Sequence, residues 1–140
     1  CHNYNVAQIS NGRIYRIAYG TPKAAPRDYS KLSEKELVQT IITHTDMWHV
    51  RMAQLALQER AARTSIDLAA VLQPLMQQLK NSGDARISLR AMWTLYRIGA
   101  LSSESIESVL DSNQAEIRGW AIRLAVDEKL HFVTRGARAI

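Results

Sequence analysis

Apolar residues recur at helical spacing in a series of short segments, each behind a residue suited to cap a helix. Ser33 and Glu36 form a capping box, in which each side chain accepts a hydrogen bond from a free backbone N–H at the helix start. Further caps are expected at Asp46, at Asp84, at Ser102 or Ser103, and at Asn113. The sequence therefore predicts an almost wholly helical body from about residue 33 to residue 130.

The apolar stripes of these segments indicate which side chains form the core. In an expected helix over 66–80 the stripe is Leu68, Leu72, Leu75, Met76 and Leu79. Pro74 lies inside this helix and should kink it without necessarily ending it, because proline removes one backbone N–H. Gly99 is expected to end the next helix in the left-handed conformation. The residues that we predict to be buried between helices are Leu72, Leu75, Leu95 and Leu124.

The six expected helices pair into three hairpins, and the second helix of each hairpin begins alike. A capping residue is followed by an arginine, and these arginines, Arg51, Arg90 and Arg118, are 39 and then 28 residues apart. Periods near 40 residues are typical of helical solenoids. The pattern resembles HEAT repeats, so we expect an all-α fold, an α–α superhelix of about three helical hairpins. Each arginine is expected to pair with an acidic or carbonyl group of the stack, such as Asp46 near Arg51 and Asp84 near Arg90.

The first 29 residues follow a different pattern. Asn11-Gly12 is a turn signal, and residues 13–19 after it have the composition of one β-strand. A single strand is not stable alone, so it requires a sheet from a preceding domain. Pro22 and Pro26 favour an extended chain after the strand. We assign residues 1–29 to an extended segment and linker, and residues 30–140 to a helical repeat domain.

Charge and cysteine content restrict the possible functions. The net charge is +5, but the arginines are spread through the helices without a run of Lys and Arg, which favours a solvated surface over nucleic-acid binding. The single cysteine allows no internal disulfide, and both a reducing compartment and a secreted domain remain open. No run of 18 apolar residues occurs, so we expect no membrane span. Because the chain begins at Cys1, we expect it to be a piece of a longer protein.

Few residues in the chain suggest catalysis or metal binding. His44 and His49 lie near Asp46 in the sequence, but they flank a helix start and no fourth metal ligand is evident. Cys1-His2 matches the end of a haem-attachment motif whose first cysteine this sequence lacks. Neither a Gly-rich phosphate loop nor a nucleophile elbow occurs. We therefore predict no catalytic residue, no cofactor and no bound metal.

Three tryptophans accompany the three arginines near the starts of the second helices: Trp48, Trp93 and Trp120. Aromatic and arginine side chains along one face of a solenoid can stack on bases and contact phosphates. In the other interpretation, the tryptophans pack between repeats and the arginines form a structural ladder. We favour the ladder, because the arginines occupy the same place in their hairpins.

Several segments together resemble a known family. They include residues 11–17 (Asn-Gly-Arg-Ile-Tyr-Arg-Ile), 28–33 (Asp-Tyr-Ser-Lys-Leu-Ser) and 89–95 (Leu-Arg-Ala-Met-Trp-Thr-Leu). These are similar to the middle of the large membrane-associated dehydrogenases of planctomycete and verrucomicrobial type. In that family a β-propeller resembling sugar dehydrogenases precedes HEAT repeats, and a cytochrome c domain follows them.

The resemblance implies that residues 1–29 end the propeller. It also implies that the helical body is a non-catalytic spacer or interaction module between propeller and cytochrome c, in a periplasmic or membrane-associated protein. Dehydrogenase activity would then belong to these neighbouring domains, and no catalytic residue can be assigned to a position here. The alternative is a module that binds a protein, or less favourably a nucleic acid, on its concave face. An enzyme in its own right is the third and weakest interpretation.

Overall fold

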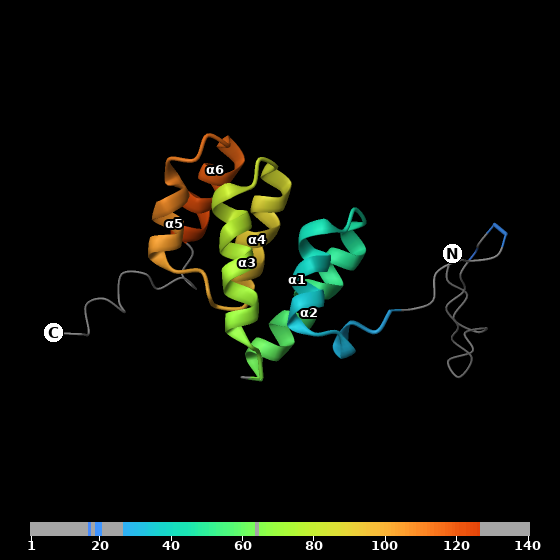
Figure 1. The fold of residues 1–140 in the computed structure, drawn as a ribbon. Helices are drawn as coiled ribbons and strands as arrows, with labels where there is room; N and C mark the ends of the chain where they lie inside the picture. Colours follow the sequence, from blue (N-terminus) through green and yellow to red (C-terminus); the bar gives the residue numbers. More distant parts are fainter. Residues whose placement is uncertain (1–16, 18, 21–26, 64, 127–140) are drawn as a thin grey trace, which may run out of the picture.

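The computed structural model describes residues 17, 19–20, 27–63 and 65–126. This part of the chain is all helical, as predicted, and it contains no strand (Figure 1). Its elements are the 3-10 turn η3 (Tyr29–Lys31) and the helices α1 (Glu34–Thr43), α2 (Met47–Ala62), α3 (Leu68–Asn81), α4 (Ala85–Arg97), α5 (Ser103–Leu110) and α6 (Ala115–Ala125). Most of the strand expected over 13–19, and the last residues of the helical body expected to extend to 130, lie outside the described residues.

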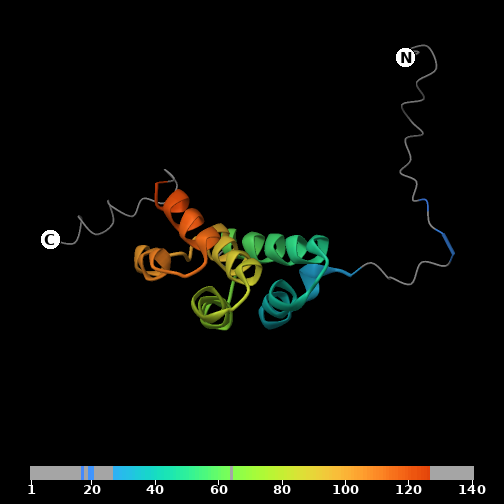
Figure 2. The same ribbon diagram turned by 90° about the horizontal axis from the view of Figure 1, so that it is seen from above.

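Successive helices pack against each other as the pairs α1/α2, α3/α4 and α5/α6. Between the pairs, α1 contacts α3 and α3 contacts α5, while α2 contacts α4 and α4 contacts α6. The first helices of the pairs therefore form one layer and the second helices form another (Figure 2). None of the helices in the described part of the chain combines the length and the hydropathy needed to cross a bilayer.

Local sequence sets where most helices begin. The Ser33 N–H donates to the Glu36 carboxylate at 2.8 Å, and the Glu36 N–H donates to the Ser33 hydroxyl at 3.3 Å, which confirms the capping box. Asp46, Asp84 and Ser102 cap α2, α4 and α5 as expected. Side-chain oxygens at these positions satisfy N–H groups that have no partner within the helix.

The start of α6 differs from the prediction. Its N-cap is Gln114 rather than Asn113, and no side chain caps its first turn. The Gln114 side chain instead donates to the Ser82 carbonyl at 3.1 Å, between the second and third helix pairs. The residue at the N-cap position therefore uses its side chain for a contact with another helix pair and does not cap α6.

Gly99 ends α4 as predicted, with a positive φ of 70°. The Gly99 N–H donates to the Tyr96 carbonyl at 3.0 Å, and the Ala100 N–H donates to the Leu95 carbonyl at 2.8 Å. This pair of bonds is the Schellman motif, which needs a residue that tolerates the left-handed conformation.

Pro74 does not end its helix, because α3 continues through it to Asn81.

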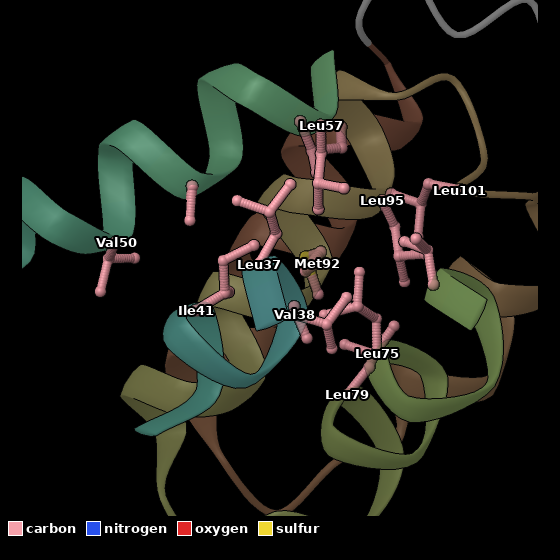
Figure 3. Packing of buried hydrophobic residues seen from close by; sticks show 14 of the residues in the cluster. Leu37, Val38, Ile41, Val50, Leu57, Leu75, Leu79, Met92, Leu95 and Leu101 are labelled. Atoms are coloured by element: carbon pink, nitrogen blue, oxygen red, sulfur yellow. The ribbon is translucent and has the colours of Figure 1, made fainter. Parts of the chain in front are cut away.

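One apolar core runs through all three helix pairs, and Figure 3 shows part of it. Leu75, Leu95 and Leu124 are buried as predicted. Leu72 is only partly buried, however, because α3 turns Val71, Leu75 and Leu79 toward the core. Both Val71 and Leu72 are apolar, so periodicity alone did not show which of them faces inward.

The capping box predicts a pH dependence of stability. Hydrogen bonds from the Ser33 backbone N–H and hydroxyl hold the pKa of Glu36 below its ordinary value of 4.5. A pKa that is lower in the folded state adds stability above the ordinary value, and this contribution is lost as the pH falls through the folded value. We expect the urea midpoint of the parent to fall more steeply below about pH 5 than that of Glu36→Gln, whose amide keeps the box without the charge. Parallel pH profiles would contradict this.

Candidate functional site

The three predicted arginines have three different environments. Arg90 of α4 donates to the His44 carbonyl at 2.9 Å and to the Ile41 carbonyl at 3.4 Å, at the end of α1. Arg118 of α6 donates to the Ser112 carbonyl at 2.6 Å, in the loop of its own helix pair. Arg51 of α2 is exposed and makes no hydrogen bond or ion pair within the described part of the chain.

The two acidic partners suggested from the sequence are therefore wrong. Asp84 forms an ion pair with Arg86 at 2.8 Å and caps α4, rather than pairing with Arg90. Asp46 accepts from the Trp48 N–H at 2.8 Å rather than from Arg51. The hydrogen bonds from Arg86 lower the pKa of Asp84, which stays ionised at neutral pH.

Small differences in register explain these outcomes. Arg51, Arg90 and Arg118 stand five, six and four residues after the N-caps of their helices. One residue turns a helix by about 100°, so side chains at these three positions leave their helices in different directions. The spacing that looked like a repeat in the sequence therefore does not give the three arginines equivalent contacts.

The three tryptophans also separate. Trp93 of α4 and Trp120 of α6 meet edge to face, with ring centroids 5.1 Å apart, and both are partly buried between the second and third helix pairs. Trp48 is 54% exposed and contacts the Tyr29 and His49 rings at the start of α2. The structure therefore brings together two of the three predicted aromatics.

A groove of about 450 Å³ crosses the layer of second helices. Its lining residues come from α2 (Met47, Arg51 and Gln54), from α4 (Trp93, Tyr96 and Arg97) and from α6 (Trp120, Arg123 and Leu124). All three helix pairs contribute, so the groove exists only when the pairs are stacked. We call this surface the second-helix groove.

Three arginines surround the second-helix groove, and none of the described residues that line it is acidic. Arg123 lies over the Trp120 ring, with its guanidinium carbon 5.1 Å from the ring centroid. Arg51, Arg97 and Arg123 are all exposed. The predicted residues Arg51, Trp93 and Trp120 line this groove, whereas Arg90, Arg118 and Trp48 lie outside it.

Sequence reasoning missed Arg97 and Arg123. Each stands in the last turn of its helix, where a basic side chain is ordinarily explained by its favourable interaction with the helix dipole. Their spacing relative to Arg51 follows no repeat. Only the stacking of α2, α4 and α6 brings them to one groove.

Buried polar groups join α2 to α4 beneath the groove. The Gln54 side chain donates to the Thr94 hydroxyl at 3.0 Å, and that hydroxyl donates to the Arg90 carbonyl at 2.6 Å. Gln54 and Thr94 are both buried, and a buried polar group without a partner is costly. These bonds therefore hold the two helices in one register under the groove.

The histidines considered for a metal do come together. The His44 and His49 ring centroids lie 4.2 Å apart, and the Tyr29 hydroxyl is hydrogen-bonded to His49 Nδ1. Burial raises the pKa of Tyr29, so its hydroxyl stays protonated at neutral pH. Within the described residues, no group of three or more His, Cys, Asp or Glu side chains is arranged to hold a metal ion. Cys1-His2 lies outside the described residues.

Comparisons with known proteins identify no relative of this chain. No protein-family model matches the chain, and searches of the curated proteins and of the solved structures found no match.

Proposed function

We propose that this chain is a non-catalytic spacer and protein-interaction module, a short HEAT-like solenoid inside a larger dehydrogenase of planctomycete and verrucomicrobial type. In this proposal a β-propeller precedes the chain, a cytochrome c domain follows it, and the protein is periplasmic or membrane-associated. The sequence resemblance supports the assignment of the chain to this parent protein. The observation that carries the spacer role is the attachment of the incoming chain to α2 by Arg60.

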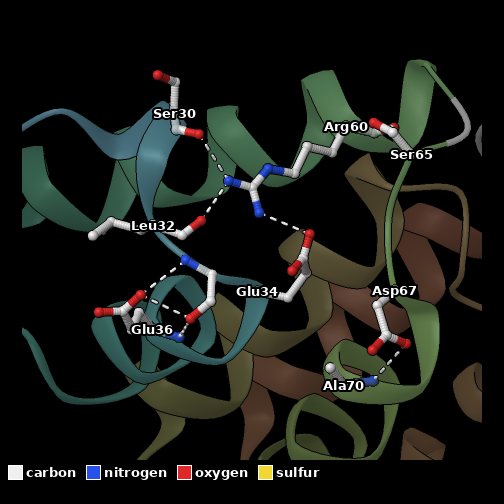
Figure 4. Close-up of polar contacts among 9 residues, drawn as sticks. Ser30, Leu32, Glu34, Glu36, Arg60, Ser65, Asp67 and Ala70 are labelled. Atoms are coloured by element: carbon white, nitrogen blue, oxygen red, sulfur yellow. Dashed lines mark hydrogen bonds and ion pairs between the residues drawn. The ribbon is translucent and has the colours of Figure 1, made fainter.

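Arg60 joins the segment before α1 to the last turn of α2 (Figure 4). Its guanidinium forms an ion pair with Glu34 at 2.7 Å and donates to the carbonyls of Ser30, at 3.0 Å, and Leu32. The Arg60 and Glu34 side chains are only 20% and 21% exposed, which reduces solvent screening of the pair. The point at which the incoming chain joins the helical body is therefore fixed, as a spacer requires.

A recurring contact between helix pairs supports the solenoid. Arg90 donates to the carbonyl of His44, the C-cap of α1, and Gln114 donates to the carbonyl of Ser82, the C-cap of α3. The second helix of one pair thus satisfies the end of the first helix in the pair before it, at both junctions. In a solenoid each repeat packs on its neighbours, so such junctions transmit rigidity along the stack.

Electron spin distance measurements test the rigid attachment. Spin labels would be placed at Lys31→Cys and Glu107→Cys, two exposed positions in η3 and α5, with Cys1→Ser removing the native thiol. We expect a narrow distance distribution in the parent and a broader one after Arg60→Ala, because the segment before α1 loses its two bonds from Arg60, at the Ser30 and Leu32 carbonyls. Arg51→Ala, on the same helix, is the control and should leave the distribution narrow. Equal widths for Arg60→Ala and the parent would remove the support for a spacer.

The full reading frame tests the proposed parent protein. A β-propeller encoded upstream and a Cys-x-x-Cys-His motif encoded downstream would support the dehydrogenase assignment. A reading frame that encodes neither of them would contradict it, whatever the rigidity of the helical body.

A second candidate function is a binding module that uses the second-helix groove. The observation that favours it is the convergence of three exposed arginines and two tryptophans on one cavity. A spacer and a binding module are compatible, because the attachment by Arg60 and the groove use different residues.

A further inference from the structure

We propose that the second-helix groove binds an extended acidic segment of a partner protein. An apolar side chain of this segment would enter the groove, and carboxylates on either side of it would bind the arginines. This inference goes beyond the spacer role and does not depend on the identity of the parent protein. It rests on the charge of the groove, on its apolar surface and on its size.

The positive charge of the groove indicates an acidic partner. Arg51, Arg97 and Arg123 come from three different helices and converge on the groove, and its lining within residues 27–63 and 65–126 contains no acidic side chain. The ion pairs of the described residues lie elsewhere, at Lys31–Asp28, Arg60–Glu34 and Arg86–Asp84. Guanidinium groups bind carboxylates in a planar two-point geometry, so three of them around one cavity favour a segment with several carboxylates.

The apolar lining of the groove indicates that the partner segment carries an apolar side chain in addition to its carboxylates. Met47, Trp93, Trp120 and Leu124 give the groove a surface that can bury an aliphatic or aromatic side chain. Tryptophan, tyrosine, methionine and arginine are the residue types enriched where proteins bind each other. The Trp93 indole N–H is buried without a hydrogen-bond partner among the described residues.

A peptide fits these contacts better than a nucleic acid does. Base stacking needs open aromatic faces, but Trp120 already carries Arg123 over its ring and meets Trp93 edge to face. Arg90 and Arg118, which could have continued a track for phosphates, are bound to main-chain carbonyls. The remaining arginines converge on one cavity of about 450 Å³ rather than following a strand.

A random-peptide phage library and a matched pair of variants test the proposal. The groove variant is Arg51→Gln with Arg97→Gln, and the control variant is Lys35→Gln with Lys80→Gln, which removes the same charge from exposed positions on α1 and α3. Circular dichroism would first show that both variants keep the helical content of the parent. Selected peptides would then be synthesised with a fluorescent label and titrated by anisotropy, beside a labelled single-stranded oligothymidine.

We expect the selected peptides to combine Asp or Glu with an apolar residue. The groove variant should bind them about tenfold more weakly or worse, while the control variant should change affinity less than about twofold, because only the former removes charge-assisted hydrogen bonds. Glutamine in place of the peptide's acidic residues should weaken binding to a similar extent. The proposal is overturned if the library yields no saturable binder, if its binders lack acidic residues, or if both variants weaken binding equally. It is also overturned in favour of nucleic acid if oligothymidine binds more tightly and only the groove variant loses that binding.

Discussion

Leu95→Ala should lower the free energy of unfolding by about 2–5 kcal/mol, the range measured when a packed leucine is truncated. Leu95 is fully buried, and its helix contacts α1, α2, α3 and α6 (Figure 3). A side chain surrounded by several helices leaves a cavity that the neighbours cannot easily fill. Typical domains have about 5–15 kcal/mol of stability in total, so this one change should remove a large part of it.

Urea unfolding followed by circular dichroism would measure the effect. Leu55→Ala is the matched control, because Leu55 is a helical leucine that is 41% exposed on α2. Its truncation should cost far less, since little apolar surface returns to water. A loss below about 0.5 kcal/mol for Leu95→Ala, or equal losses at both positions, would show that the core does not pass between α4 and its neighbours.

Arg90→Ala should lower the free energy of unfolding by about 1.5–3 kcal/mol, the value typical of hydrogen bonds that involve a charged group. Its guanidinium satisfies carbonyls at the end of α1, and the substitution leaves these carbonyls without that donor. Arg51→Ala removes an arginine from nearly the same place in the preceding hairpin. It should change stability by less than about 0.5 kcal/mol, because Arg51 is exposed and bonds to no other described residue.

The same pair of variants separates a structural role from nucleic-acid binding. Affinity for single-stranded DNA, measured by anisotropy at several salt concentrations, should be the same for Arg90→Ala and the parent. A phosphate contact would instead reduce the slope of affinity against salt by roughly one unit for each lost contact. An Arg90→Ala protein that melts like the parent but loses salt-dependent binding would contradict the structural role.

Much of the local structure could be predicted because its causes are local. A capping side chain contacts backbone groups two or three residues away, so Ser33, Asp46 and Asp84 could be assigned without knowing any tertiary contact. Gly99 is a similar case, since the left-handed conformation is a property of the single residue. The prediction was wrong at Asn113, because the N-cap of α6 is Gln114, whose side chain reaches Ser82 in another helix pair.

The candidate site could not be predicted in the same way. Arg51, Trp93 and Trp120 were chosen for their place near helix starts, and they line the groove together with Arg97 and Arg123 from helix ends. Positions so different within their helices meet because α2, α4 and α6 lie side by side with a particular stagger. Periodicity within one helix carries no information about that stagger.

The sequence by itself determined the helices, their pairing and most of their buried faces, because caps, turns and apolar spacing act over a few residues. The tertiary structure alone decided which arginines bind carbonyls and which surround the groove. A shift of one residue turns a side chain by about 100°, and the neighbour it then meets belongs to a helix far away in the chain. Arg90 therefore supports the end of α1, while Arg51, one position earlier in its own helix, faces the groove.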